Sequence, residues 1–113
     1  MTAIYKILSL ADWRGALESG LVPPADIDRR DGFIHLSAED QVLETARLHF
    51  AGREDLVAAE FCAEDFGDHL KWEASRGGAL FPHLFAELRA DKATLARRLV
   101  AADGGFEFGG DVE

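Results

Sequence analysis

Runs of apolar residues and regular polar alternation divide most of the chain into short strands and two helices. Apolar side chains dominate residues 3–9 (AIYKILS) and 55–64 (DLVAAEFCAE), which predicts two strands, the second one central in a sheet. After the first strand, apolar residues recur at helical spacing up to Gly20, and Ser9 is placed to cap that helix. The chain is therefore expected to begin as a strand followed directly by a helix.

A second helix is predicted after the segment GFIHLS (residues 32–37). Ser37 is placed to cap it, with Glu39 and Asp40 in its first turn, and Gly52 is placed to end it. The preceding segment, residues 21–32 (LVPPADIDRRDG), contains two prolines and several aspartates, which predict an irregular surface loop.

The second half of the chain is predicted to form mainly strands. Residues 69–75 and 79–85 flank the turn sequence SRGG and predict a hairpin. Residues 91–101 (DKATLARRLVA) fit either a helix, which propensity favours, or a two-sided strand. Together the elements predict an α+β domain over residues 1–103, with two helices packed on a mainly antiparallel sheet, and a C-terminal tail over residues 104–113.

Charge, apolar content and cysteine content limit the binding partners and the cellular location that we expect. Twelve basic and twenty-one acidic residues give a net charge of −9, which argues against a nucleic-acid partner. No apolar run is long enough for a membrane span, and the N-terminus lacks a signal-peptide pattern, so we expect a cytoplasmic protein without a membrane partner. The single cysteine, Cys62, excludes an intrachain disulfide and a cysteine-rich zinc site. The oligomeric state is left open.

Two histidines stand among large apolar residues, in DGFIHLS (31–37) and in FPHL (81–84). Strand periodicity places Phe33, His35 and Ser37 on one face of the first segment. Beside a helix N-terminus, His35 and Ser37 are candidates for holding ligand hydroxyls or an anionic group. Alternatively, Ser37 is only a helix cap and His35 only hydrogen-bonds a neighbouring carbonyl.

In the second segment, Phe81, His83 and Phe85 share a face, which suits either the wall of a pocket for a flat ring or ordinary core. The predicted hairpin brings Trp72 and Glu73 beside His83, although periodicity points these two residues to opposite faces. A carboxylate such as Glu73 can stabilise positive charge on a sugar, or it can simply pair with a neighbouring cation.

Other recognisable chemistry is missing from the sequence. No His-x-His or His-Glu-x-x-His spacing occurs, so no metal site is expected. The chain also lacks a Gly-x-Gly-x-x-Gly fingerprint, a phosphate-loop motif and a Gly-x-Ser-x-Gly elbow.

Several segments taken together resemble the bacterial family known as domain of unknown function 952. They are IYKIL, DGFIHLS, LKWE and LFPHLF, with Gln41, Thr45 and Ala46, and the resemblance covers about residues 3–100. This family is placed, by distant similarity, near the ADP-ribosyltransferases, which break the nicotinamide–ribose bond of NAD. The resemblance implies an ADP-ribosyltransferase-like fold, and it favours a strand over residues 94–101, against local propensity.

The resemblance also implies roles for individual residues. The triplet HLS at residues 35–37 resembles the His-Gly-Thr-like triplet that holds the adenosine ribose of NAD, with Leu36 as a departure. Taken together with the strand and hairpin pattern, the leading assignment places His35, Ser37, Trp72 and Phe81 at a bound NAD, and Glu73 and His83 in the catalytic centre. The catalytic glutamate of the ADP-ribosyltransferases has no secure match, because Glu73, Glu87 and Glu107 all remain possible.

The expected function is thus an ADP-ribosyltransferase-like enzyme acting on NAD or an ADP-ribosyl ligand at a ribose glycosidic bond. One alternative is a non-catalytic binding module for a nucleotide or small metabolite. The other is a structural domain in which both histidines are satisfied core residues.

Overall fold

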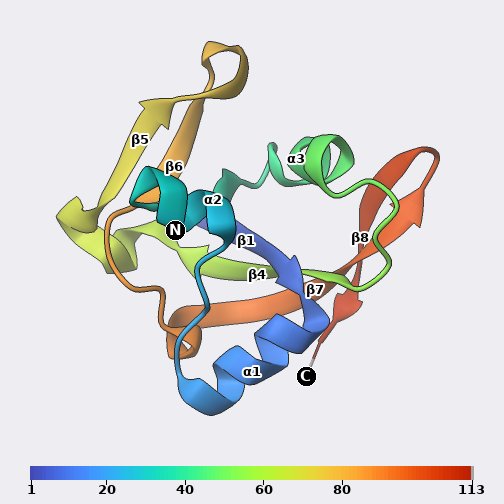
Figure 1. The fold of residues 1–113 in the computed structure, drawn as a ribbon, viewed down its shortest axis with the longest axis horizontal. Helices are drawn as coiled ribbons and strands as arrows, with labels where there is room; N and C mark the ends of the chain where they lie inside the picture. The colour runs from blue at the N-terminus through green and yellow to red at the C-terminus, as the bar shows by residue number, and fades with distance from the viewer. Residues whose placement is uncertain (113) are drawn as a thin grey trace.

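Two antiparallel sheets form the frame of the molecule in a computed structural model that describes residues 1–112 (Figure 1). The larger sheet has the strand order β3-β1-β4-β7-β8, and the smaller sheet has the order β2-β6-β5. The strands are β1 (Ala3–Ser9), β2 (Ile34–His35), β3 (Ser37–Ala38), β4 (Leu56–Cys62), β5 (Leu70–Ala74), β6 (Leu80–Leu84), β7 (Ala93–Ala102) and β8 (Gly105–Asp111). The helices are α1 (Leu10–Ser19), α2 (Asp26–Asp31) and α3 (Val42–His49), with 3₁₀ turns at Ala63–His69, Arg76–Gly78 and Ala90–Lys92. The predicted α+β class with a mainly antiparallel sheet is confirmed.

Helix α1 forms where the sequence predicts it. The Ser9 hydroxyl accepts a hydrogen bond from the Asp12 N–H at 3.0 Å, which satisfies one of the free donors of the first turn. Gly20 ends the helix in the left-handed region, with φ of 91°, a conformation that glycine adopts without a steric penalty.

The segment between α1 and β2 differs from the prediction, because residues 26–31 form the short helix α2 rather than an irregular loop. The Asp28 carboxylate accepts a hydrogen bond from the Ala25 N–H at 2.8 Å and so closes the first turn of this helix. A helix this short is marginal on its own, so its stability comes from tertiary contacts that propensity does not reveal.

Ser37 does not cap α3, so this prediction is wrong. Ser37 lies in β3, opposite Tyr5 of β1, and the helix begins only at Val42. Gln41 closes the intervening turn, because its side-chain oxygen accepts from the Ala38 N–H at 2.9 Å and its amide nitrogen donates to the Leu80 carbonyl at 2.7 Å.

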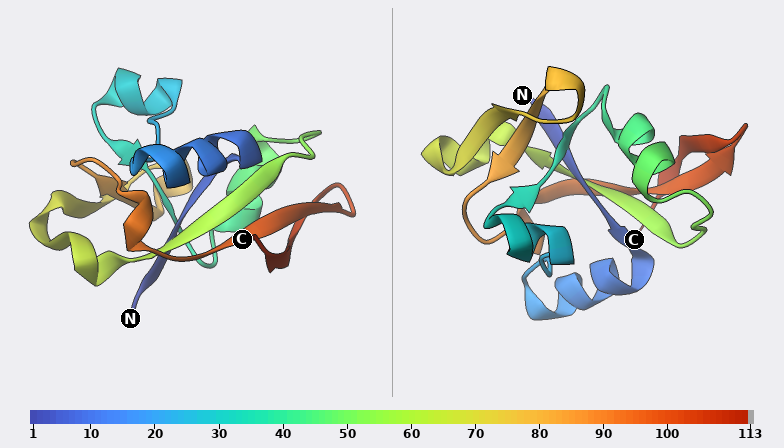
Figure 2. Two further views of the ribbon diagram at one scale, coloured as in Figure 1. Left: turned by 90° about the horizontal axis from the view of Figure 1, so that it is seen from below. Right: turned by 45° about the horizontal axis from the view of Figure 1, so that its top comes forward.

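The two faces of the five-stranded sheet are covered by different elements, as the two views of Figure 2 show. One face packs against α1 and the smaller sheet, and the other face packs against α3. The first core contains Ile4, Leu8, Trp13, Ala16, Ile34, Leu36, Val57, Phe61, Leu84 and Leu88, and the second contains Tyr5, Ile7, Val42, Ala46, Leu56, Ala58 and Leu99. Alternate residues of β1 and β4 therefore belong to different cores, as expected for strands buried on both faces.

The C-terminal third is entirely sheet and turns. Residues 93–102 form β7, so the strand implied by the family resemblance is correct and the helix favoured by propensity is not. The expected C-terminal tail is also corrected, because Gly105–Asp111 form β8, which pairs with β7. Pairing with a neighbouring strand here overrides a composition rich in glycine.

Within residues 1–112, no helix combines the length and the apolar content needed to cross a membrane.

Candidate functional site

The two histidines meet. Strand β2 pairs with β6 so that His35 stands directly opposite His83, and directly opposed residues project from the same face of a sheet. Their ring centroids are 5.4 Å apart, with the rings edge to face. The sequence predicts both residues as candidates, and the register of this short pairing makes them one cluster.

The ring of His35 is held by two carboxylates of α2. Its Nδ1 lies 2.8 Å from Oδ1 of Asp28, and its Nε2 lies 3.0 Å from Oδ2 of Asp31. Carboxylates only accept hydrogen bonds, so both contacts are satisfied together only when each ring nitrogen carries a hydrogen. The Arg30 guanidinium and then His35 hold the pKa of Asp31 below its usual value.

Asp28 also binds the ammonium group of Lys6, which crosses from the larger sheet. Lys6 Nζ lies 2.8 Å from Asp28 Oδ2 and 3.2 Å from the His35 carbonyl oxygen, and the two side chains are only 6% and 1% exposed. Burial alone would raise the pKa of Asp28, but the Lys6 charge and hydrogen bonds from Lys6, His35 N–H and Ala25 N–H outweigh it and lower that pKa. For Lys6, burial prevails and the pKa is lowered. This buried pair fixes α2, and with it the carboxylates that hold His35.

His83 has a carboxylate partner of its own. Its Nδ1 lies 2.9 Å from Oε1 of Glu73, which stands on β5 two positions beyond Lys71, the residue directly opposite His83. The His83 side chain is 6% exposed, whereas that of Glu73 is 44% exposed. The hydrogen bond fixes the orientation of the imidazole and leaves the carboxylate open to solvent.

Aromatic rings complete the cluster. Phe33 stacks on His83 with centroids 4.1 Å apart and also contacts His35 and Phe85, at 4.6 and 5.1 Å. Phe81 projects from the same face of β6, opposite Glu73, and is buried. The shared face of Phe81, His83 and Phe85 thus agrees with the period-two prediction.

Two of the predicted binding residues lie elsewhere. Ser37 pairs with Tyr5, so it projects toward α3, the opposite side of the larger sheet from Lys6 and Asp28. Trp72 pairs with Pro82 and therefore projects from the face of the smaller sheet opposite to His83. The structure does not bring Ser37 or Trp72 to the histidine cluster.

The three glutamates left open by the sequence are now separated. Glu73 contacts His83, and Glu87 lines a groove that begins at Phe33. Glu107 lies in β8, opposite Val100 of β7. Geometry therefore favours Glu73 as the carboxylate that accompanies the histidines.

An open groove of about 630 Å³ adjoins the cluster. Phe33 and Phe85 line it together with residues of the α1–α2 and β6–β7 connections, and its charged groups are Asp28, Arg29 and Glu87. Its volume lies within the range of pockets for drug-sized ligands, and its lining is mainly apolar.

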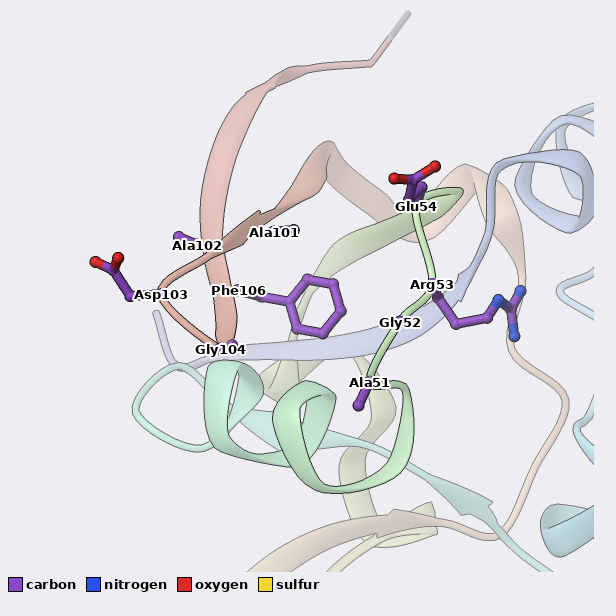
Figure 3. Close-up of a pocket in the computed structure, with 10 residues that line it drawn as sticks. Ala51, Gly52, Arg53, Glu54, Ala101, Ala102, Asp103, Gly104 and Phe106 are labelled. Atoms are coloured by element: carbon purple, nitrogen blue, oxygen red, sulfur yellow. The ribbon is translucent and has the colours of Figure 1, made fainter.

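A second hollow, of about 370 Å³, lies between the α3–β4 connection and the β7–β8 turn (Figure 3). The ring of Phe106 projects into it, whereas Arg53 and Asp103 point outward. With no converging polar side chains, this hollow offers no evident chemistry.

Over the described part of the chain, no group of three or more histidine, cysteine, aspartate and glutamate side chains is arranged to hold a metal ion.

The chain also matches known proteins in sequence and in fold. A model of the family described as protein of unknown function (DUF952) matches residues 7–96. The chain belongs to this family. Its structure is similar to the X-ray crystal structure of CC0527 from Caulobacter crescentus, at 48% identity over 94% of each chain and a TM-score of 0.87. A solution NMR structure of CC0527 gives 47% identity, coverage of 94% of this chain and 91% of that one, and a TM-score of 0.82. No curated protein matches the chain.

Membership in DUF952 confirms the family resemblance seen in the sequence motifs, whereas the relation to ADP-ribosyltransferases stays a proposal. Sequence reasoning missed three residues of the histidine cluster, namely Lys6, Asp28 and Asp31. A signal existed for Lys6, which is the one charged residue in the apolar run AIYKILS and therefore needed a buried partner. No comparable signal singled out Asp28 and Asp31 within the acidic segment ADIDRRDG, because only tertiary packing selects them.

Proposed function

We propose that this DUF952 domain is an ADP-ribosyltransferase-like protein that binds NAD or an ADP-ribosyl ligand and acts at a ribose glycosidic bond. The observation that carries the proposal is the direct pairing of His35 with His83. Each ring is oriented by its own carboxylates, and the pair adjoins a ligand-sized groove.

Cleavage of the nicotinamide–ribose bond develops positive charge on the ribose carbon. A carboxylate that is held in place stabilises such positive charge, whereas a positively charged imidazolium would repel it. Glu73 meets this requirement, because its hydrogen bond to His83 fixes it while nearly half of its side chain stays exposed. In this proposal, Glu73 faces the reacting carbon, and His83 holds Glu73 in place.

The groove supplies a complementary binding surface. Phe33 and Phe85 offer aromatic walls against which a flat base can pack. Arg29, which is mostly exposed, is the cation on the groove wall and is placed to pair with a phosphate. In this arrangement, His35 and the Asp31 carboxylate, whose side chains are 26% and 29% exposed, approach the ribose hydroxyls.

The test measures binding and cleavage separately. We expect NAD or ADP-ribose to raise the melting temperature by mass action, and we expect nicotinamide release from NAD in a chromatographic assay. Glu73→Gln should abolish release, whereas Glu107→Gln, a matched change in β8, should keep it. His35→Ala should remove the thermal shift, and His49→Ala, at an exposed position of α3, should not.

Two outcomes contradict the proposed activity. A thermal shift without nicotinamide release would instead support a non-catalytic binding module. No shift with NAD, ADP-ribose or nicotinamide, together with loss of stability in both His35→Ala and His83→Ala, would show that the histidines are structural core residues.

A further inference from the structure

The outer edge of β5 is unpaired within the described residues and can accept another strand. In the smaller sheet β5 pairs with β6 on one side, and no strand of residues 1–112 pairs with its other side. The β5–β6 hairpin projects from the body of the molecule with β5 outermost (Figure 1). Two large apolar side chains near this edge are exposed, Trp72 at 39% and Leu80 at 55%. Such an edge is a template for pairing with another strand.

Successive residues of a strand point their backbone N–H and C=O groups to alternate sides, and this alternation determines which residues of β5 face the open edge. The hairpin hydrogen bonds run from Ser75 N–H to the Ala79 carbonyl and from Phe85 N–H to the His69 carbonyl. Hydrogen-bonded pairs alternate along an antiparallel ladder, so the backbone groups of Lys71 and Glu73 point toward β6. The backbone groups of Leu70, Trp72 and Ala74 therefore point outward. The Leu70 N–H already donates to the Gly67 carbonyl, which leaves the outward groups of Trp72 and Ala74 and the Leu70 carbonyl for a new strand.

The side chains of β5 are self-complementary in one register. If a second β5 runs antiparallel with Trp72 opposite Trp72, then Leu70 stands opposite Ala74, and the outward backbone groups meet as hydrogen-bonded pairs. The same register places each Lys71 opposite the Glu73 of the second copy, giving two opposite-charge pairs. A shift of one residue would misalign the backbone donors. A shift of two would lose both charge pairs and would set Glu73 opposite Glu73 or Lys71 opposite Lys71.

Because the backbone hydrogen bonds and the charge pairs both fit this one register, we propose that two copies of this chain form a symmetric dimer. Their β5 strands pair antiparallel about a two-fold axis at Trp72. The smaller sheets then join into one continuous sheet of six strands, and the two Trp72 rings pack across the axis. Charged residues on an edge usually prevent such pairing, but here they alternate in sign and favour it in this single register.

The dimer also bears on the histidine cluster, although the inference does not depend on the proposed function. Lys71 of the second copy lies beside Glu73, which hydrogen-bonds His83. Each Glu73 thus gains a second cation, besides Lys71 of its own chain, which stands opposite His83.

Charge reversal tests the register. Analytical ultracentrifugation over a concentration series, up to submillimolar, should show the wild-type chain at twice the mass of one chain. Lys71→Glu places Glu opposite Glu73, and Glu73→Lys places Lys opposite Lys71, so each variant alone should be monomeric. A mixture of these two variants should form a heterodimer, because every cross-strand pair is then of opposite charge. Lys92→Glu, the same charge change at an exposed site away from β5, should leave the dimer intact.

A second variant checks the backbone contacts. Trp72→Pro removes an outward N–H that the monomer does not use for the β5–β6 ladder, so the folded monomer should persist while the dimer is lost. Circular dichroism confirms that it is folded. A wild-type chain that stays monomeric at the highest concentration would overturn the proposal. So would a dimer that survives Trp72→Pro, or one in which the Lys71→Glu and Glu73→Lys variants fail to complement each other.

Discussion

Disrupting the buried pair of Lys6 and Asp28 should be among the most damaging conservative changes in this domain. Asp28→Asn keeps the shape of the side chain but removes the charge that faces the Lys6 ammonium at 2.8 Å. The ammonium then keeps only neutral oxygens as partners, among them the His35 carbonyl at 3.2 Å. Removing one partner of a buried pair costs about 3–5 kcal/mol, because the other charge is left uncompensated. A domain of this kind has a total stability of about 5–15 kcal/mol, so the variant should be marginally stable.

Urea unfolding gives the free energy directly. Trp13 is buried in the core of the larger sheet and α1, so its fluorescence reports global unfolding. Lys6→Met should also destabilise the chain, because it leaves the Asp28 carboxylate buried without its cation. Combining Lys6→Met with Asp28→Asn removes both charges, so the double variant should lose less than the sum of the single losses, by about 2–3 kcal/mol.

The exposed pair of Arg89 and Asp91 provides the control. Their nitrogen–oxygen distance is also 2.8 Å, but both side chains are mostly exposed. Asp91→Asn should therefore leave the free energy of unfolding almost unchanged. Additivity within about 0.5 kcal/mol for Lys6→Met and Asp28→Asn would refute the reasoning, since it would mean that the two charges do not stabilise each other.

Two further outcomes follow from the same structure. Because the folded chain lowers the pKa of Asp28, its stabilising contribution is fully present above the unfolded carboxyl pKa of about 3.9 and is lost as the pH falls through the lower folded value. The urea midpoint should thus fall more steeply with acidification below about pH 4 in the wild-type chain than in Asp28→Asn, and parallel profiles would contradict this. In β8, a methyl group at Gly109 would lie 2.7 Å from Val100 Cγ2, whereas nothing lies within 4 Å of one at Gly110. Gly109→Ala should therefore lower the free energy of unfolding by about 1 kcal/mol relative to Gly110→Ala, and equal stabilities would show that Val100 moves aside without cost.

Local patterns predicted the elements whose formation depends mainly on their own residues. The run AIYKILS and the capped helix after Ser9 were clear because periodicity, cap and stop signal agree. Residues 93–102 were not clear, because alanine and arginine favour a helix locally, and only pairing with β4 and β8 makes them a strand. The C-terminal strand was missed for the same reason, since its glycines are compatible with a strand only when a neighbouring strand is present.

The candidate site was predicted in part. His35, His83, Glu73 and Phe81 were identified and do share one face of the smaller sheet. Periodicity failed for Ser37, because the chain leaves one sheet after His35 and enters the other at Ser37, so the two residues belong to different strands. The contribution of Asp28 depends on a short helix that itself depends on Lys6, and no local rule anticipates such mutual support.

The switch of the chain at Leu36 brings β3 beside β1, and the resulting strand order affects how the larger sheet assembles. Strand β1 lies between β3 and β4, so the first strand of the chain is completed only by residues far along it: the Tyr5 hydroxyl bonds Glu60, 55 positions away. Such distant pairings must close long loops before any burial rewards them, which places refolding in the millisecond-to-second range of sheet-rich domains. During synthesis, β1 can gain its second neighbouring strand only after β4 has left the ribosome.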